Sequence, residues 1–293
     1  MKAQNLVPNP SFEDTVHCPT SINELYDCQL WMNPTNATPD YFNACSVGVH
    51  VPNNGYGIQS AHTGVAYTGI YTFNKPYAQY REYIQIGLSS PLLTNHKYFI
   101  SFYLSLAEVS QYAVSSIGAY LSSTPIVSTN TVVLSYSPQI QNKSSNVLTD
   151  KNNWMFISDT LYADGGEQYM TIGNFKRDSL SDTLFLGNIG GSNLAYYYID
   201  DISVIDNGPM DVDQYKKDVR VHIYPNPANE VLNIEVDLQN AELKIIDVLG
   251  NEVKNGKFNG KAQIDISDLK EGIYFANIIT SEGIIIKKII VQH

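Results

Sequence analysis

The sequence predicts an all-β protein of two domains, and three observations support this. Apolar and polar residues alternate with a period of two over much of the chain, as they do in half-buried strands. Clusters of Gly, Asn, Ser and Pro, which are typical of turns, separate these runs. The chain has no pattern of a long amphipathic helix, and its 293 residues suit two domains of roughly 100–200 residues each.

Composition and charge narrow the classes of function. Hydrophobic residues make up 43% of the chain and charged residues 16%, which is enough apolar material for real cores. The formal net charge is −11, so nucleic acid and anionic lipid, which attract basic patches, are poor partners. No apolar stretch approaches the roughly 20 residues of a membrane-spanning helix. We interpret Met1–Lys2 as a start added to a mature chain whose export signal was removed; a genuine cytosolic start is the alternative.

The three cysteines favour an oxidising compartment. Cys18, Cys28 and Cys45 all lie in the first sixth of the chain, where a scatter of free core thiols would not cluster. Cys18 and Cys28 close a short loop and are the candidate disulfide, although an odd number of cysteines leaves the pairing open. Zinc is the alternative, but no Cys-x-x-Cys motif and no nearby pair of histidines supports it.

Residues 1–207 form the first predicted domain, and alternation assigns faces to its strands. In "KYFISFYLSLAE" (97–108) the residues Tyr98 to Leu106 at even positions face the core, and Phe99 to Ser105 at odd positions face the other side. In "YREYIQIGL" (80–88) Tyr80, Glu82, Ile84 and Ile86 are expected in the core. Further strands are predicted at "SIGAYLSS" (116–123), "WMFISDTLYA" (154–163), "QYMTIGNF" (168–175), "TLFLGNI" (183–189) and "YYYIDDISVI" (196–205).

A polar stretch, residues 208–219, has no periodic pattern of apolar residues and is predicted to be a linker.

Residues 220–293 form the second predicted domain. About seven short strands in this segment predict a small immunoglobulin-like β-sandwich. Its strand motifs are "VHIYPN", "EVLNIEV", "ELKIIDV", "AQIDISD", "GIYFANIIT" and "GIIIKKIIVQ".

Four motifs follow one another in this second domain. They are "YPNPANEVLNI" at 224–234, "IDVLGNEV" at 246–253, "IDISDLKEGIYFANI" at 264–278 and "GIIIKKIIVQ" at 283–292. In order and spacing they resemble the type A C-terminal sorting domain of type IX secretion substrates from Bacteroidetes. Proline fixes φ and removes a donor, so Tyr-Pro-Asn-Pro is expected to end an edge strand. The resemblance implies sorting-signal residues Tyr224, Pro225, Asn226, Pro227, Gly250, Gly272, Tyr274, Lys287 and Lys288, with positive φ expected at the two glycines.

The resemblance also implies a route to the cell surface. Such proteins cross the inner membrane by an N-terminal signal and the outer membrane through the type IX translocon. An outer-membrane shuttle barrel reads the tail, and a surface sortase often cleaves it and transfers the cargo to lipopolysaccharide. We therefore expect a secreted or cell-surface protein associated with the outer membrane, with a natural cut within residues 208–220.

The two ends of the first domain carry a second resemblance. "NLVPNPSFED" (5–14) and "YYYIDDISVI" (196–205) resemble the first and last strands of jelly-roll carbohydrate-binding modules. The resemblance implies a jelly-roll β-sandwich with a structural Ca²⁺, an ion that prefers several oxygen ligands. Glu13 and Asp201 are the matching side chains, and Asn9 and the backbone of residues 62–64 would add oxygens. The alternative is that Asp200 and Asp201 are turn or capping acids.

The sequence favours binding over catalysis. It has no His-Glu-x-x-His and no Gly-x-Ser-x-Gly motif. The carboxylate pairs Glu13/Asp14 and Asp200/Asp201 are adjacent, so on a strand they point to opposite faces and do not flank one glycosidic bond. We predict a protein that is not an enzyme.

A predicted binding face supports this. Sugars stack on aromatic rings and hydrogen-bond to rigid polar groups. If the strands neighbour as in a jelly roll, one sheet face collects Arg81, Tyr83, Gln85, Tyr103 and Tyr120. The alternative is that tyrosine occurs here only as a good strand former.

The predicted function is therefore that of an adhesin or glycan-binding module on the cell surface. The alternative is an accessory structural component of the type IX secretion or gliding machinery, docked through an uncleaved tail.

One further sequence pattern agrees with a location on the cell surface. Asp-[Ser/Thr]-apolar triplets resemble the O-glycosylation pattern of Bacteroidetes, and the candidate sites are Thr15, Thr160, Ser179 and Thr183.

Overall fold

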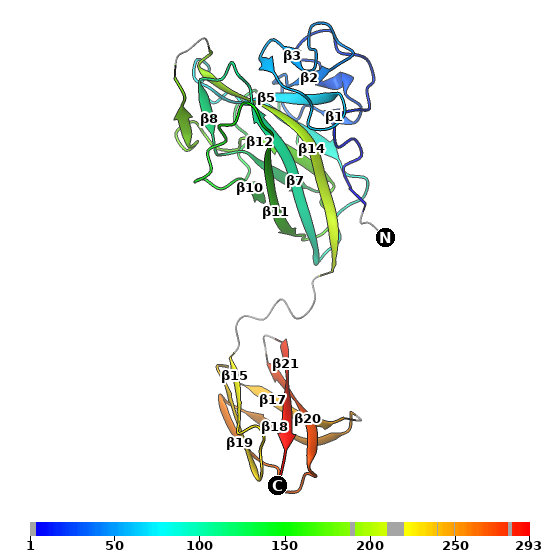
Figure 1. Ribbon diagram of the computed structural model, residues 1–293, viewed down its shortest axis with the longest axis vertical. Coiled ribbons are helices and arrows are strands. Elements are labelled where there is room, and N and C mark those ends of the chain that lie inside the picture. Colours follow the sequence, from blue (N-terminus) through cyan, green and yellow to red (C-terminus); the bar gives the residue numbers. More distant parts are fainter. Residues whose placement is uncertain (1–3, 188–190, 210–219, 239, 249, 281–282) are drawn as a thin grey trace. The chain divides into compact units, whose positions relative to one another are not determined.

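A computed structural model describes residues 4–187, 191–209, 220–238, 240–248, 250–280 and 283–293 (Figure 1). The chain divides into Met1–Pro209 and Met210–His293, here called unit 1 and unit 2. Among the described residues the helical structure is one short 3-10 turn, η1 (Leu25–Asp27), and the rest of the regular structure is strand. The all-β prediction is confirmed. The described part of the chain holds no helix long and apolar enough to cross a membrane.

Unit 1 is a sandwich of two antiparallel five-stranded sheets. The first sheet has the order β1-β6-β12-β9-β10, and the second has the order β11-β7-β14-β5-β2. The strands of the first sheet are β1 (Trp31–Met32), β6 (Tyr83–Gly87), β12 (Tyr169–Gly173), β9 (Gly118–Ser122) and β10 (Ile140–Gln141). Those of the second are β11 (Met155–Tyr162), β7 (His96–Leu106), β14 (Leu194–Pro209), β5 (Ala66–Asn74) and β2 (Asp40–Asn43). Two short pairs complete the unit: β3 (Asn53–Asn54) with β4 (Gly57–Ile58), and β8 (Tyr112–Val114) with β13 (Thr183–Phe185).

The main core lies between these two sheets, because each sheet turns one row of apolar side chains inward. On β7 the even-numbered residues Ile100, Phe102 and Leu104 are fully buried, as the alternation predicts. They share one core cluster with Ile84 of β6 and Ile172 of β12, which come from the other sheet. The pattern of period two therefore predicted the inward face of the long strands correctly.

The end of unit 1 differs slightly from the predicted boundary. The last strand, β14, continues to Pro209, two residues beyond the expected end of the first domain at 207. It pairs with the start of β7, where Pro209 lies opposite His96. The first two residues of the expected linker thus belong to a strand, and residues 210–219 lie outside the described part of the chain.

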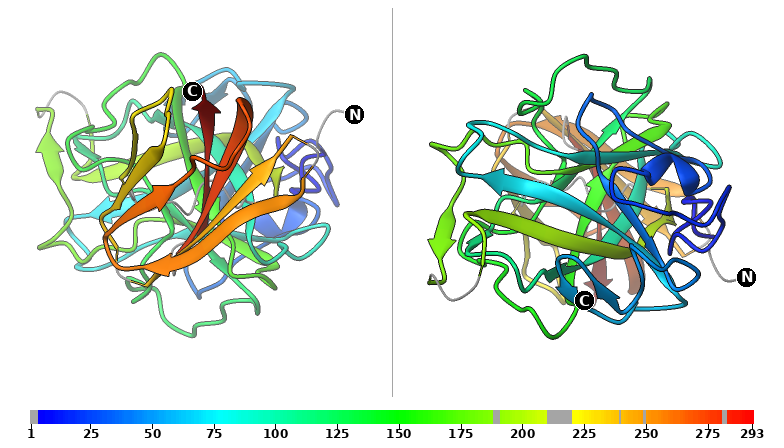
Figure 2. Two further views of the ribbon diagram at one scale, coloured as in Figure 1. Left: turned by 90° about the horizontal axis from the view of Figure 1, so that it is seen from below. Right: turned by 90° about the horizontal axis from the view of Figure 1, so that it is seen from above.

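Unit 2 is a smaller sandwich of a three-stranded and a four-stranded sheet (Figure 2). The strands are β15 (Val221–Tyr224), β16 (Val231–Val236) and β19 (Lys261–Asp265) in one sheet, and β18 (Glu252–Phe258), β17 (Ala241–Asp247), β20 (Gly272–Thr280) and β21 (Gly283–Val291) in the other. Leu232 and Ile234 of the first sheet and Leu243, Ile245 and Ile278 of the second form one core. The predicted small sandwich is confirmed.

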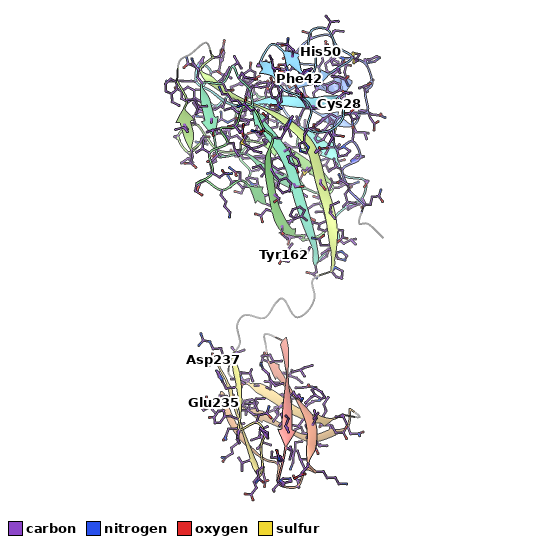
Figure 3. The ribbon with its side chains drawn as sticks, viewed as in Figure 1. Cys28, Phe42, His50, Tyr162, Glu235 and Asp237 are labelled. Atoms are coloured by element: carbon purple, nitrogen blue, oxygen red, sulfur yellow. A yellow bond between two sulfur atoms is a disulfide. The ribbon has the colours of Figure 1, made fainter. Side chains whose placement is uncertain are left out.

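The predicted Cys18–Cys28 disulfide is wrong. Cys18 is bonded to Cys45, with 6.0 Å between the Cα atoms and a sequence separation of 27. Cys28 follows η1 and is buried as a free thiol (Figure 3), where the side-chain amide of Asn9 donates to its Sγ at 3.4 Å. Burial raises the pKa of this thiol. Cys28 lies in the core directly after the short turn η1, whereas Cys18 and Cys45 lie in exposed loops. The number of residues between two cysteines does not reveal this difference in burial.

Candidate functional site

The structure does not bring the five predicted ligand residues together. Tyr83 and Gln85 lie on β6 and Tyr120 on β9 of the first sheet, but Tyr103 lies on β7 of the second sheet. Arg81 and Tyr83 are 0% exposed and Gln85 is 1% exposed. The prediction of one open face that carries all five residues is therefore wrong.

The segment between β9 and β10, residues 123–139, covers the outer side of β6. The Tyr83 hydroxyl accepts the backbone N–H of Leu134 at 3.0 Å and donates to the carbonyl of Asn174 at 2.7 Å. The backbone N–H of Ile126 donates to Gln85 Oε1 at 2.8 Å. Alternation separates the two faces of a strand, but it does not show that a loop covers the second face.

Arg81 holds another loop rather than a ligand. Its guanidinium donates to Asp178 Oδ1 at 2.7 Å and to the carbonyl of Lys176 at 3.0 Å. Asp178 also accepts the backbone N–H of Gln79 at 2.7 Å. A buried charge of this kind is stable because it is paired and hydrogen-bonded. Arg81 thus fixes the loop that follows β12.

Tyr103 belongs to a row of rings on the outer side of the second sheet. Its ring stacks on His62 with 3.7 Å between centroids, and Phe156, its cross-strand partner, lies 5.0 Å away. Neighbouring rings therefore occupy much of the Tyr103 surface that a sugar would need. This row is on a different sheet from Tyr120, so the two tyrosines do not share a site.

Tyr120 is the predicted residue that lines a hollow. The hollow has a volume of about 580 Å³ and is bordered by Tyr120 and Tyr136, whose rings stack with centroids 4.7 Å apart. Tyr136 is 42% exposed, so part of its ring remains open to solvent. We call this feature the Tyr136 hollow. Its polar lining includes Ser122, Thr124, Gln139, Asp164 and Glu167.

Local hydrogen bonds hold the walls of the Tyr136 hollow in place. The Gln139 side chain donates to the carbonyl of Leu121 and accepts its N–H, both at 2.9 Å, which fastens the covering segment to β9. On the opposite wall the Glu167 carboxylate accepts the N–H groups of Asp164 at 3.0 Å and Gly165 at 2.9 Å. Gly165 has φ of +98°, and a Cβ there would lie 2.0 Å from Thr94 Oγ1, so this turn requires glycine. The hollow is therefore built from fixed elements.

The predicted calcium residues are only partly brought together. Glu13 Oε1 accepts the N–H groups of Val65 at 2.9 Å and Ala66 at 3.0 Å. Asp201 accepts the Thr63 hydroxyl at 2.6 Å and contacts His62 Nδ1. Asp201 thus contacts residues 62 and 63 of the expected stretch, whereas Glu13 contacts the N–H groups of residues 65 and 66, and the calcium stays a prediction.

Asn9 does not join them. Its side chain donates to the carbonyls of Asp14 and Gln29, each at 3.0 Å, and accepts the N–H of Asp14 at 3.1 Å. Asn9 therefore forms a turn here, and its role as a calcium ligand stays a prediction. Among the described residues no group of three or more His, Cys, Asp or Glu side chains is arranged to hold a metal. An ion here would need backbone oxygens beside Glu13 and Asp201.

Asp200, the neighbour of Asp201, is a capping acid. It is fully buried and accepts the N–H groups of His62 at 2.8 Å and Thr63 at 3.2 Å. Desolvation, together with the nearby charge of Asp201, raises the pKa of Asp200 to about 8. Asp200 therefore agrees with the alternative prediction, in which this residue is a turn or capping acid.

Unit 1 contains a cluster of buried acids and tyrosines that the sequence did not predict. Glu82 accepts the Tyr80 hydroxyl and the N–H of Tyr71, both at 2.9 Å, and Asp40 accepts the Tyr196 hydroxyl. The Tyr56 ring stacks on Tyr196 with centroids 3.9 Å apart. The alternating pattern predicted Glu82 on the core face. A buried acid at this position is the feature of the sequence that could have revealed the cluster.

The acids of this cluster have shifted pKa values. Burial is the largest cause, and it raises the pKa of Glu82 to about 8 and that of Asp40 to about 6. Shifted carboxylates are common in active sites. Here each side chain is only 1% exposed, so a substrate has no access and the cluster is structural.

Most of the predicted sorting-signal residues lie in turns and on edge strands of unit 2, while Gly272 and Tyr274 lie on the inner strand β20. Edge strand β15 ends at Tyr224, as the following prolines predict. Asn226 then donates to the carbonyl of Lys288 at 2.9 Å and accepts the N–H of Ile290 at 2.8 Å, which fastens the motif to β21. Gly250 has φ of +86° in the turn before β18, and Gly272 opens β20 with φ of +156°. Tyr274 is buried and donates to the carbonyl of Lys270, while Lys287 and Lys288 are exposed on β21.

The four candidate glycosylation residues differ in exposure. Thr15, Ser179 and Thr183 are exposed, and Thr160 is half-buried on edge strand β11. Exposure is needed for modification, so Thr160 is the least accessible of the four. Their modification stays a prediction.

The fold and these features define a two-unit β-sandwich protein with a preformed surface hollow in unit 1. Residues 222–292 match the family described as "Secretion system C-terminal sorting domain". The sorting domain predicted from the four motifs is therefore present in unit 2. A domain of this kind directs a protein to the cell surface through type IX secretion.

Several solved structures resemble parts of the chain. PorZ, a surface component of the type IX secretion system of Porphyromonas gingivalis, is 18% identical over 33% of this chain, with a TM-score of 0.25, and this chain spans 15% of its length. The CBM22-1 xylan-binding domain of Paenibacillus barcinonensis Xyn10C is 12% identical, over 71% of this chain and 98% of its own, with a TM-score of 0.40. The K2 adhesin domain of Lys-gingipain is 16% identical, over 67% and 95% of the two chains, with a TM-score of 0.31. No curated protein matches the sequence.

Proposed function

We propose that this chain is a non-catalytic cell-surface protein whose unit 1 binds a glycan in the Tyr136 hollow. One observation carries the proposal: the stacked pair Tyr120 and Tyr136 borders a preformed hollow of about 580 Å³ whose lining also includes hydroxyl, amide and carboxylate groups. The sorting domain in unit 2 supports the location on the cell surface.

The chemistry of the hollow suits a sugar. The C–H face of a sugar ring packs on an aromatic ring, and its hydroxyls need donors and acceptors nearby. Tyr136 offers a half-open ring that is held in place by Tyr120 behind it. Ser122, Thr124 and Asp164 line the same hollow and supply hydroxyl and carboxylate groups. A ring that is already fixed loses little entropy on binding, which favours affinity.

The direct test removes the exposed ring. We expect Tyr136→Ala to weaken binding by about tenfold or more, because a lost stacking contact is worth roughly 1–2 kcal/mol. Affinity electrophoresis against a panel of soluble neutral and acidic polysaccharides measures this. Tyr77→Ala is the matched control, since Tyr77 is 69% exposed and borders none of the hollows described for unit 1. Wild-type binding by a folded Tyr136→Ala variant would overturn the proposal, and so would failure of the wild type to bind any member of the panel.

Structural calcium at the loop 62–66 is a separate proposal. The contacts of Glu13 and Asp201 with this loop support it, and the lack of Asn9 in the set weighs against it. A ligand that binds only the folded state stabilises that state, so a chelator should lower the melting temperature of unit 1 by several degrees. The Asp201→Asn variant should lose this response. An unchanged melting temperature with chelator in the wild type would remove the metal.

A further inference from the structure

Three hollows adjoin one another along one side of unit 1. The second hollow, of about 300 Å³, shares Tyr136 with the first and is also lined by Gln141, Lys176 and Arg177. The third, of about 340 Å³, shares Gln141 with the second and is also lined by Lys143 and Phe156. Each hollow shares a lining residue with its neighbour, and we treat the three together as one elongated groove. We call it the Tyr136–Phe156 groove.

The groove passes from one sheet to the other. Tyr120 lies on β9, Gln141 on the adjacent edge strand β10, and Phe156 on β11 of the second sheet. Two partly open rings stand along it, Tyr136 with 42% and Phe156 with 50% of its surface exposed. A single sugar fills one hollow, whereas a row of hollows with spaced rings fits a chain of several units.

Positive charge is concentrated in the second hollow. Lys176 and Arg177 line this hollow without an acidic neighbour in its lining, and the third hollow is lined by Lys143 together with Asp159. Lys176 lies 3.7 Å from Asp182, and Arg177 has no ion pair to a described residue. Basic side chains are otherwise scarce in an acidic chain with a net charge of −11. Those in residues 4–209 are Lys75, Arg81, Lys97, Lys143, Lys151, Lys176 and Arg177.

The basic residues outside the groove have other structural roles. Arg81 is buried against Asp178, and Lys151 donates to the carbonyls of Glu108 and Ser110. Lys75 donates to the Tyr112 hydroxyl, and Lys97 lies over the ring of Tyr162 at the far end of β11 (Figure 3). Arg177 and Lys143 are exposed, and neither has a side-chain partner of this kind among the described residues, so they are available to a ligand.

We propose that the Tyr136–Phe156 groove binds a linear acidic glycan, one whose sugars carry carboxylate or sulfate groups. This inference rests on the proposed function, because the same Tyr136 ring begins the groove. The apolar C–H face of one sugar lies on the ring of Tyr136. The acidic groups of the glycan lie at Arg177 and Lys143, where guanidinium and ammonium groups form charge-assisted hydrogen bonds with them.

The test compares two series of oligosaccharides of matched length. Oligogalacturonides are the acidic probe and cello-oligosaccharides the neutral probe, each with two, four and six sugars, titrated by calorimetry. We expect the acidic series to bind more tightly, with a preference that grows with length and falls at high salt, since exposed charge pairs are screened. The variant Lys176→Gln/Arg177→Gln should lose about tenfold in affinity for the acidic series and bind the neutral series as before.

Controls separate this inference from the proposed function. Lys97→Gln removes a positive charge outside the groove and should leave both series unchanged, and Tyr136→Ala should weaken both. Equal affinity for acidic and neutral series, or an acidic preference that survives in Lys176→Gln/Arg177→Gln, would overturn the acidic glycan and leave the glycan-binding hollow standing. An affinity that does not grow with length would overturn the groove. Tight binding of polyglutamate or single-stranded DNA in place of the acidic series would show a general anion site and would also overturn the inference.

Discussion

Tyr83 and Tyr136 show how the role of a tyrosine depends on what covers it. Tyr83 lies on a regular strand and is fully buried because residues 123–139 cross over it. Tyr136 lies within that covering segment and is half-open. The alternating pattern identifies tyrosines that lie on strands. The exposed ring of Tyr136 lies in a loop, where no periodic pattern predicts its position.

This contrast predicts different effects on stability. We expect Tyr83→Ala to lower the free energy of unfolding of unit 1 by about 3–5 kcal/mol, because it empties a buried site and removes the partners of Leu134 and Asn174. Tyr136→Ala should cost less than about 1 kcal/mol. Urea titration followed by tryptophan fluorescence measures both. Similar costs for the two variants would show that the covering segment does not lie on Tyr83.

The disulfide is tested by peptide mapping of the oxidised protein. We expect a cross-link between the peptides of Cys18 and Cys45, and alkylation of Cys28 only after denaturation, because its thiol is buried. Replacing both bonded cysteines with serine should lower stability by about 3–4 kcal/mol, as the loop-closure relation gives for a loop of this length. A Cys18–Cys28 peptide would contradict the structure.

Asn226 is the residue that joins the Tyr-Pro-Asn-Pro motif to β21. Asn226→Ala should remove two hydrogen bonds, destabilise unit 2 by about 1 kcal/mol and speed hydrogen exchange at the amide of Ile290. Asn255→Ala is the control, because Asn255 bonds only the exposed side chain of Glu252 among described side chains. Unchanged exchange at Ile290 would contradict this role.

At the scale of the elements, the buried acids join strands that are far apart in sequence. Asp40 lies on β2, Tyr71 on β5 and Tyr196 on β14, and Glu82 precedes β6 in the other sheet. Hydrogen bonds among them connect the two sheets at one end of unit 1. This network works best with neutral acids, because burial makes the carboxylate forms costly.

The stability of unit 1 should therefore fall as pH rises from about 5 to 8.5. The folded-state pKa values of Glu82 and Asp200, each about 8, lie above the usual values of 4.5 and 3.8. Both groups are protonated in the folded state at pH 5, and the unfolded state binds fewer protons, so stability declines through this range.

The variant Glu82→Gln tests the contribution of one group. Gln is neutral at every pH, accepts the N–H of Tyr71 and donates to the Tyr80 hydroxyl, so it should reduce the loss of stability between pH 5 and 8.5 by at least about 1 kcal/mol. Melting temperatures across this range measure the effect, with the exposed Asp159→Asn as control. An equal slope in Glu82→Gln and wild type would remove Glu82 as the cause.

These elements also show how far the sequence predicts the molecule. The inward faces of β6 and β7 followed from alternation, and unit 2 followed from four motifs with the right spacing. The Tyr136 hollow did not, because its walls include the segment 123–139 and the turn at 164–167, whose positions depend on long-range contacts such as Gln139 with Leu121. The disulfide was missed for the same reason, since folding rather than loop length places Cys45 beside Cys18.

At the scale of the whole molecule, our proposal gives the two units separate tasks. Unit 2 matches a secretion sorting domain over residues 222–292, and most of the predicted signal residues lie in turns and on edge strands. Unit 1 carries the groove. The rival function, an accessory part of the secretion or gliding machinery, assigns the whole chain to permanent contact with the translocon or shuttle barrel.

One measurement separates these accounts: purification of the tagged protein from native outer membranes, followed by mass spectrometry of the chain and sugar analysis of what it carries. Our account predicts a surface-exposed chain, cut within residues 208–220 or intact, with bound glycan that is lost in Tyr136→Ala and without stoichiometric translocon subunits. An intact chain that holds the translocon or shuttle barrel in fixed ratio and carries no glycan would contradict it.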